Sequence, residues 1–196
     1  MKPRIRFSKT ELKQLFISWT LISLAFAMVL TPDYSLGSLI LSTLISLFTV
    51  GIGFIFHELS HKFVAQYYGC FAEFRSNMQM LIFALVTAFF GFVYAAPGAV
   101  VIFGHVSNSE HGKISLAGPA ANFIVALGFF VLRLLVPSSL IRIVFGYGAY
   151  INSFLAVFNL IPFGNMDGVK VFKWNKVVYF SVMALSGLLL VMNYIL

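Results

Sequence analysis

An apolar run that ends in polar and charged residues constrains the fold of this chain more than any other feature. The run covers residues 39–56 and closes on His57-Glu58-Leu59-Ser60-His61, which has the pattern H-E-x-x-H. A helix with about 20 apolar residues is long enough to cross the hydrocarbon core of a membrane. Ionisable groups at such a depth are costly and are normally kept for function. The run therefore predicts a membrane-embedded helix with a functional site near one end.

Composition extends this prediction to the whole chain. Of its 196 residues, 60% are hydrophobic and only 10% are charged, whereas soluble domains are usually about 45–50% apolar and about 25% charged. We expect an all-α polytopic membrane protein that forms one domain over residues 1–196 in a lipid bilayer. The net charge of +7 does not indicate a nucleic-acid partner, because the basic residues lie beside apolar segments, as in cytoplasmic flanks of membrane helices.

About six membrane segments are expected from the apolar stretches and the turns between them. They cover residues 15–30, 36–68, 78–103, 114–136, 140–160 and 177–196. Within the third segment, Pro97-Gly98 ends a helix and the β-branched run after it favours a strand. We therefore predict a short re-entrant or β element at about 95–106, between the second and fourth segments. Polar turns are expected at 31–34 and 108–112, and the helix at 114–136 is entered through Gly118-Pro119.

The basic residues of 1–13 predict a cytoplasmic N-terminal tail. Ala25-Phe26-Ala27 also fits a signal-peptide cleavage site, but the apolar stretch is long and we expect the first helix to be retained. In either case the second helix starts outside the cell. It then carries His57 and His61 toward the cytoplasmic face.

His57 and His61 are one helical turn apart and share a face. Two imidazoles at this spacing can bind one zinc ion, with Glu58 beside them as a general base. A catalytic zinc site usually has a third protein ligand. Asp167 is the best candidate, because it lies between two apolar helices. The other acidic residues lie in the tail, a turn or polar stretches expected to be solvated: Glu11, Asp33, Glu73 and Glu110.

The order of two motifs resembles the site-2 protease family of intramembrane zinc metalloproteases. H-E-x-x-H is followed by N-x-x-P-x-x-x-x-D-G, which is formed by Asn159, Pro162, Asp167 and Gly168. The Ala-Gly-Pro-Ala-Ala-Asn stretch at 117–122 is also similar to the family. The resemblance covers a catalytic core at about 39–176 and includes no PDZ-like insert, as in a minimal member.

The resemblance implies that His57, His61 and Asp167 bind one zinc ion. It also implies that Glu58 acts as general base for a zinc-activated water, and that Asn159 holds or polarises the scissile carbonyl. The activity implied is regulated intramembrane proteolysis, in which a peptide bond in or near the transmembrane segment of a membrane-protein substrate is hydrolysed. From the distribution of basic residues we expect the protein to lie in the cell membrane, with the N-terminus and the active-site face in the cytoplasm.

Other functions remain open at this stage. A membrane zinc transporter or metal-binding channel could use the same three ligands, although it has no need of Glu58 as a base. A non-catalytic scaffold descended from a protease is a further alternative, and the number of copies in the assembly stays open. Asn122 can simply form hydrogen bonds between helices. We expect His105 and His111 to be loop residues.

Topology follows from the requirement that Asp167 meets the two histidines. Segment 78–103 must leave the cytoplasmic side and return to it, either as a full helix with an extended return or as a shallow hairpin. Only Arg133 and Arg142 of the 13 Lys and Arg residues then lie outside. We expect that an edge strand at about 99–103 pairs with an unwound substrate segment and presents it to zinc.

Overall fold

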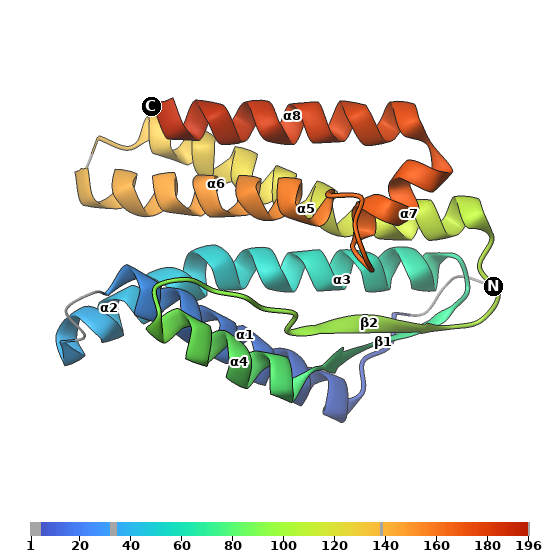
Figure 1. Ribbon diagram of the computed structural model, residues 1–196, viewed down its shortest axis with the longest axis horizontal. Helices are drawn as coiled ribbons and strands as arrows, with labels where there is room; N and C mark the ends of the chain where they lie inside the picture. The colour runs from blue at the N-terminus through green and yellow to red at the C-terminus, as the bar shows by residue number, and fades with distance from the viewer. Residues whose placement is uncertain (1–4, 32–34, 138, 196) are drawn as a thin grey trace.

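The computed structural model describes residues 5–31, 35–137 and 139–195. Five of its helices are long and apolar enough to cross a membrane, and a two-stranded sheet lies beside them (Figure 1). The predicted turn at 31–34 falls mostly outside the described residues. The elements in chain order are α1 (Lys9–Leu30), α2 (Leu36–Ser46), a π-helical turn (Leu47–Gly51), α3 (Ile52–Tyr67), β1 (Phe71–Ser76), α4 (Met78–Phe89), β2 (Gly98–Phe103), α5 (Asn108–Leu135), α6 (Ser139–Asn159), α7 (Asp167–Trp174) and α8 (Lys176–Ile195).

The helices form layers around α3, as Figure 1 shows. α5, α6 and α8 lie on one side of α3, and α1, α4 and the sheet lie on the other. α2, the π-helical turn and α3 form one continuous helical span at Leu36–Tyr67. Small buried residues such as Ala126 and Ala149 let α5 and α6 pack closely. This layering places the H-E-x-x-H sequence of α3 in the middle of the molecule.

The third predicted segment leaves one end of the molecule and comes back to it. α4 has only 12 residues, which give a length of about 18 Å at 1.5 Å per residue, less than the hydrocarbon core of about 30 Å. After α4 the chain returns through β2, which pairs with β1 in antiparallel register from Phe71↔Phe103 to Ser76↔Gly98. The predicted β element is therefore present, and β1 is an additional strand that the sequence did not reveal.

One edge of the sheet is sealed by α1. The backbone N–H groups of Phe74 and Ser76 donate to the side-chain oxygens of Glu11 (2.9 Å) and Gln14 (3.1 Å). These two residues of β1 therefore point their backbone groups away from β2. In an antiparallel pair, the backbone N–H and C=O groups of the residue opposite then also point away from the partner strand. Gly98, Val100 and Ile102 are opposite such outward-facing residues, so their backbone groups face the open edge of β2.

Several expectations about individual segments were wrong. α5 begins at Asn108, where a polar turn was expected, because Ser107 and Glu110 form a capping box. Gly118-Pro119 therefore lies inside α5. Glu11 and Glu73, expected in solvated stretches, are 0% and 6% exposed. The tail predicted for 1–13 is helical from Lys9 onward.

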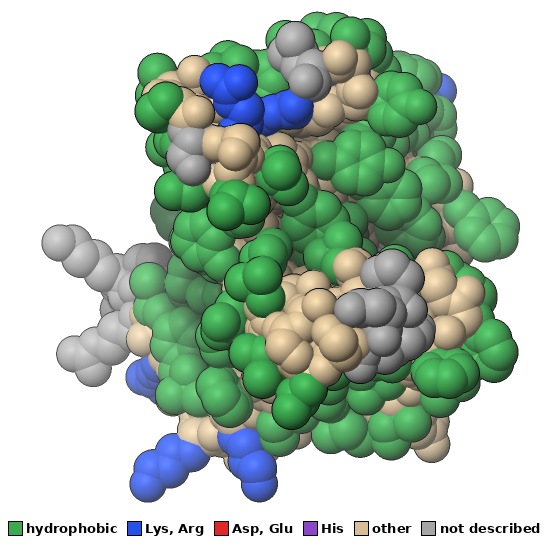
Figure 2. Space-filling view, turned by 90° about the vertical axis from the view of Figure 1, so that its left-hand side faces the viewer, with side chains coloured by type: hydrophobic (Ala, Val, Ile, Leu, Met, Phe, Trp, Pro, Cys, Tyr) green, Lys and Arg blue, Asp and Glu red, His purple; other side chains and the backbone are tan. Residues whose placement is uncertain are grey.

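The surface agrees with a membrane environment. Figure 2 shows that hydrophobic side chains cover most of the end that carries the α5–α6 turn and the start of α2. Exposed leucines and isoleucines lie on the outer faces of the long helices, with Leu36 75%, Leu135 72% and Leu140 76% exposed. In a bilayer these side chains contact lipid.

Candidate metal centre

α3 presents two histidines on the face that it turns toward α5. His57 and His61 are buried, with 8% and 9% of their surface exposed. Their spacing of four residues brings the rings together on one face, and the two Nε2 atoms lie 3.0 Å apart. Gly118 makes this packing possible, because a Cβ atom at that position of α5 would overlap both imidazoles.

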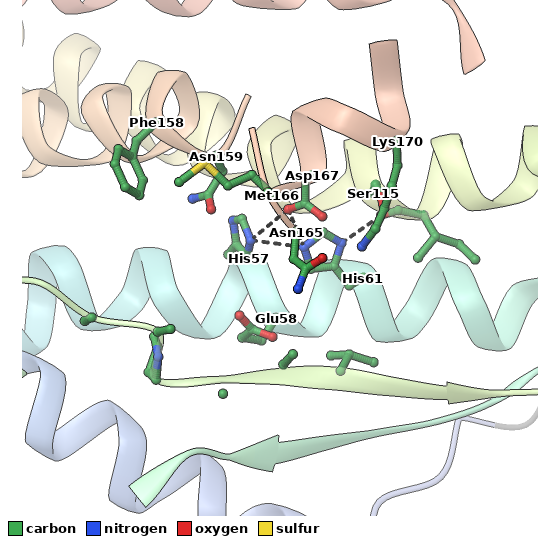
Figure 3. A pocket seen from close by; sticks show the side chains of 18 of the residues that line it. His57, Glu58, His61, Ser115, Phe158, Asn159, Asn165, Met166, Asp167 and Lys170 are labelled. Atoms are coloured by element: carbon green, nitrogen blue, oxygen red, sulfur yellow. Dashed lines mark hydrogen bonds and ion pairs between the residues drawn. The ribbon is translucent and has the colours of Figure 1, made fainter. Parts of the chain in front are cut away.

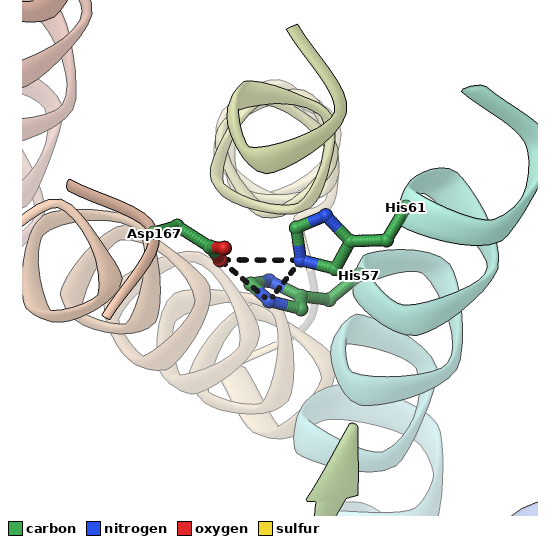
Figure 4. Close-up of side chains that lie close together, drawn as sticks. All are labelled: His57, His61 and Asp167. Atoms are coloured by element: carbon green, nitrogen blue, oxygen red, sulfur yellow. Dashed lines mark hydrogen bonds and ion pairs between the residues drawn. The ribbon is translucent and has the colours of Figure 1, made fainter. Parts of the chain in front are cut away.

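A carboxylate from another part of the chain completes the cluster. Asp167 is the first residue of α7, after Met166 at the N-cap. Its Oδ2 atom lies 3.1 Å from Nε2 of His61 and 3.5 Å from Nε2 of His57 (Figure 4). In a tetrahedral zinc site, metal–ligand distances of about 2.0–2.2 Å place ligand atoms about 3.3–3.6 Å apart. The measured separations of 3.0, 3.1 and 3.5 Å lie in this range or slightly below it, so the three donor atoms suit one zinc ion in chemistry and in approximate spacing.

Hydrogen bonds behind the rings orient the ligand nitrogens. The Nδ1 atom of His61 lies 2.7 Å from the carbonyl oxygen of Ile114. A carbonyl only accepts hydrogen bonds, so His61 carries its proton on Nδ1 and turns the Nε2 lone pair toward the cluster. On His57, Nδ1 lies 2.6 Å from Oδ1 of Asn122.

The charge of Asp167 is maintained by these imidazoles. Burial raises the pKa of its carboxyl group, but the charges and hydrogen bonds of His61 and His57 in their protonated form outweigh this effect and hold the pKa below its ordinary value. Binding of zinc would release the Nε2 protons of the two imidazoles. The carboxylate is thus available as an anionic ligand.

Glu58 and Asn159 line the space beside the cluster without belonging to it (Figure 3). Glu58 is 7% exposed, and its Oε2 atom has no hydrogen-bond partner among the described residues. Asn159 at the end of α6 uses one amide N–H on the Leu155 carbonyl at 2.9 Å, and its second N–H has no hydrogen-bond partner among the described residues. A carboxylate and an amide donor thus face the same space as the metal-ligand candidates.

Two cavities meet at this point. One of about 540 Å³ extends along β2 to the loop before α7, and polar groups such as His111, Asn165 and Lys170 contribute to its lining. The other, of about 340 Å³, is lined mainly by apolar residues of α1, of α6 and of the 93–97 loop before β2. Both contact His57, Glu58 and Asn159. The cluster can therefore be reached from a cavity with polar lining and from a mainly apolar one.

The sequence of this chain is similar to a known protein over nearly its full length. It is 42% identical over 193 residues to "Putative zinc metalloprotease MJ0611" of Methanocaldococcus jannaschii, with 96% of this chain and 97% of the relative covered. The chain belongs to this zinc metalloprotease family. No protein-family model matches the chain, and no solved structure matches it.

Membership of a zinc metalloprotease family agrees with the side chains that the structure brings together. The predicted grouping of His57, His61 and Asp167 is present. His111, expected in a loop, lies in the first turns of α5 and lines the larger cavity, but it is not part of the metal group. The sequence did not reveal the contact of Asn122 with His57. The only hint was its place four residues after Gly118, on the same face of α5.

Proposed function

We propose that this chain is a membrane-embedded zinc endopeptidase of the site-2 protease type, which hydrolyses a peptide bond in or near the transmembrane segment of a membrane protein. The observation that carries the proposal is the meeting of His57, His61 and Asp167 beside the unpaired carboxylate of Glu58. Such a cluster inside an apolar helical bundle is costly unless it serves a function. The family relationship supports hydrolysis of peptide bonds as that function.

His57, His61 and Asp167 would hold the ion. Zinc in such a site supplies a Lewis acid that polarises a carbonyl oxygen and makes water more acidic. The Glu58 carboxylate takes the proton of the attacking water and later passes it to the leaving amine, as a general base and then a general acid. The free N–H of Asn159 donates to the oxygen of the scissile carbonyl as negative charge develops there.

The open edge of β2 supports a way of presenting the substrate. A helical substrate uses its backbone groups internally, so it must unwind before cleavage. Gly98, Val100 and Ile102 line the larger cavity and direct their backbone N–H and C=O groups to the open edge. An unwound substrate segment pairs with this edge as a third strand. The strand then lies beside Glu58 and the metal ligands.

We propose that the protein lies in the cell membrane with its active-site face toward the cytoplasm. This orientation leaves Arg133 and Arg142 as the basic residues on the outer side, in agreement with the positive-inside rule. The short α4 favours a shallow re-entrant hairpin for segment 78–103 over a full span. Backbone that is not helical is tolerated at membrane depth where it is buried or lines a wet cavity.

Glu58→Gln tests this function against zinc transport. A protease with this substitution retains one zinc per chain in purified protein and loses cleavage of a membrane-embedded model substrate, because the amide cannot accept the proton. Glu110→Gln is a matched control on the partly exposed capping residue of α5. Cleavage by Glu58→Gln at the wild-type rate would rule out the proposed mechanism. Zinc flux into liposomes at the same rate for Glu58→Gln and the wild type would, in addition, favour a transporter.

A further inference from the structure

Two buried amides connect His57 to the helical span that carries it. Oδ1 of Asn122 lies 2.6 Å from Nδ1 of His57, and Nδ2 of Asn122 donates to Oδ1 of Asn152 at 3.1 Å. Nδ2 of Asn152 in turn donates to the carbonyl oxygens of Thr49 (3.2 Å) and Gly148 (2.9 Å). Thr49 belongs to the π-helical turn before α3. The chain of hydrogen bonds therefore runs from a metal-ligand candidate back to its own helix through α5 and α6.

The donors and acceptors in this series of hydrogen bonds can be paired in only one way. Both N–H groups of Asn152 are used on backbone carbonyls, so its oxygen is left to accept. Asn122 donates to that oxygen and to the Gly53 carbonyl at 3.2 Å, so its own oxygen is also left to accept. An acceptor 2.6 Å from Nδ1 of His57 requires that this nitrogen donates. The Nε2 lone pair of His57 is then directed toward Asp167 and His61.

The site of these amides is closed and closely packed. Asn152 is fully buried and Asn122 is 1% exposed. Gly53 leaves the space that they occupy, because a Cβ atom there would overlap the Asn152 side chain. Reversing either amide would place N–H against N–H or oxygen against oxygen in a buried site, which leaves buried polar groups unsatisfied and is unfavourable. The amides are therefore held in one orientation.

We propose that Asn122, held in place by Asn152, is a positioning residue of the metal centre. It keeps His57 in the tautomer with the proton on Nδ1 and aims Nε2 at the metal. His61 obtains the same tautomer from the Ile114 carbonyl, whereas His57 depends on a side chain that can be changed. The inference rests on the proposed zinc site, and it concerns affinity for the ion, not the chemical step.

Zinc affinity of the purified full-length protein, measured by competition with a chelator, tests the proposal. Asn122→Leu removes the acceptor and lowers the affinity about 10–100-fold, the range found when partners behind metal-binding histidines are removed. Asn122→Asp keeps an oxygen that accepts from Nδ1 and retains most of the affinity. Its other oxygen faces the Gly53 and Asn152 oxygens without a donor, so this variant is less stable than the wild type while its zinc affinity is kept. Asn152→Leu lowers affinity about 10-fold, and it adds little to Asn122→Leu because it acts through the same amide.

Asn193→Leu is the matched control. Asn193 is another buried amide of the bundle, bonded to Ser153 and to the Leu189 carbonyl, but it does not contact a metal-ligand candidate. Its substitution changes folding stability without changing zinc affinity. The rescue by Asn122→Asp is thus a readout that a purely structural role of Asn122 would not produce.

Nitrogen NMR of ¹⁵N-histidine-labelled, zinc-loaded protein reports the tautomer directly, since the chain has four histidines. The wild type gives a protected Nδ1–H signal for His57, and Asn122→Leu loses that protection while the signal of His61 persists. Wild-type affinity in Asn122→Leu, or equal losses in Asn122→Asp and Asn122→Leu, would overturn the proposal. Absence of zinc binding by the wild type would instead overturn the proposed function.

Discussion

Lys62 forms an ion pair with Glu11 in the protein interior, one residue after the metal-facing His61. The two side chains are 1% and 0% exposed. The same carboxylate accepts the backbone N–H of Phe74 in β1 at 2.9 Å. A single side chain of α1 therefore joins the helix of the metal ligands to the sheet that borders the site.

Removing one member of this pair is expected to destabilise the protein strongly. Lys62→Met leaves the Glu11 carboxylate buried without its partner. Glu11→Gln likewise leaves the Lys62 ammonium group buried without a carboxylate. Each change costs about 3–5 kcal/mol, as for other broken buried pairs. The double variant is less destabilised than the sum of the two, because no unpaired charge remains. Denaturant unfolding in detergent measures these effects, with the exposed Lys13 changed to Met as control.

Gly118→Ala is expected to abolish tight zinc binding. The added methyl group would overlap the His61 ring at its Nε2 atom and also reach the His57 ring, so the rings must move from their ligand positions. Gly128→Ala on the same helix is the matched control, since no atom lies within 4 Å of its added Cβ. It retains zinc and gains up to about 1 kcal/mol of helix stability. Equal zinc content in both variants would contradict the close packing of α5 on the histidines.

The sequence allowed prediction of the elements whose signal is local. Long apolar stretches predicted the spanning helices, and the Pro97-Gly98 break followed by β-branched residues predicted β2. β1 was missed because Phe71–Ser76 contains two charged residues and becomes a strand only through its pairing with β2 and the Glu11 and Gln14 side chains. α7 was missed because its eight residues, Asp167–Trp174, include a glycine in the first turn and two lysines, and were taken for the end of a loop and a basic stretch.

The grouping of His57, His61 and Asp167 was predictable from motif spacing, but the contacts that support it were not. His57 and His61 are neighbours on any helix, and Asp167 was the best-placed acidic residue left over. Asn122 and Asn152 lie on different helices, and no local pattern states that their amides meet. The burial of Glu11 likewise depends on where Lys62 of α3 packs. Such contacts depend on tertiary structure and cannot be inferred from a single chain segment.

Removal of zinc is expected to lower the stability of the whole bundle. The three proposed ligands lie on α3 and at the start of α7, so a bound ion ties these elements together. A ligand that binds only the folded state at 1,000 times its Kd stabilises that state by about 4 kcal/mol. A chelator therefore lowers the unfolding midpoint of the wild type, and added zinc restores it. Asp167→Ala shows no such response, and a full zinc response in that variant would exclude Asp167 as a ligand.

Proline substitutions test the two edges of β2 independently of each other. Val100→Pro and Ile102→Pro remove N–H groups that face the open edge, so the pairing with β1 survives and zinc content is unchanged. Proline is accepted on the unpaired side of an edge strand. Each lost hydrogen bond to an unwound substrate costs up to about 1.5 kcal/mol, or about 10-fold in cleavage. Val100→Ala keeps the N–H group and serves as control.

Val101→Pro removes an N–H group that faces β1, so it disrupts the hairpin and lowers stability as well as cleavage. Unimpaired cleavage by both Val100→Pro and Ile102→Pro, measured with a membrane-embedded substrate, would show that the substrate does not bind as a third strand.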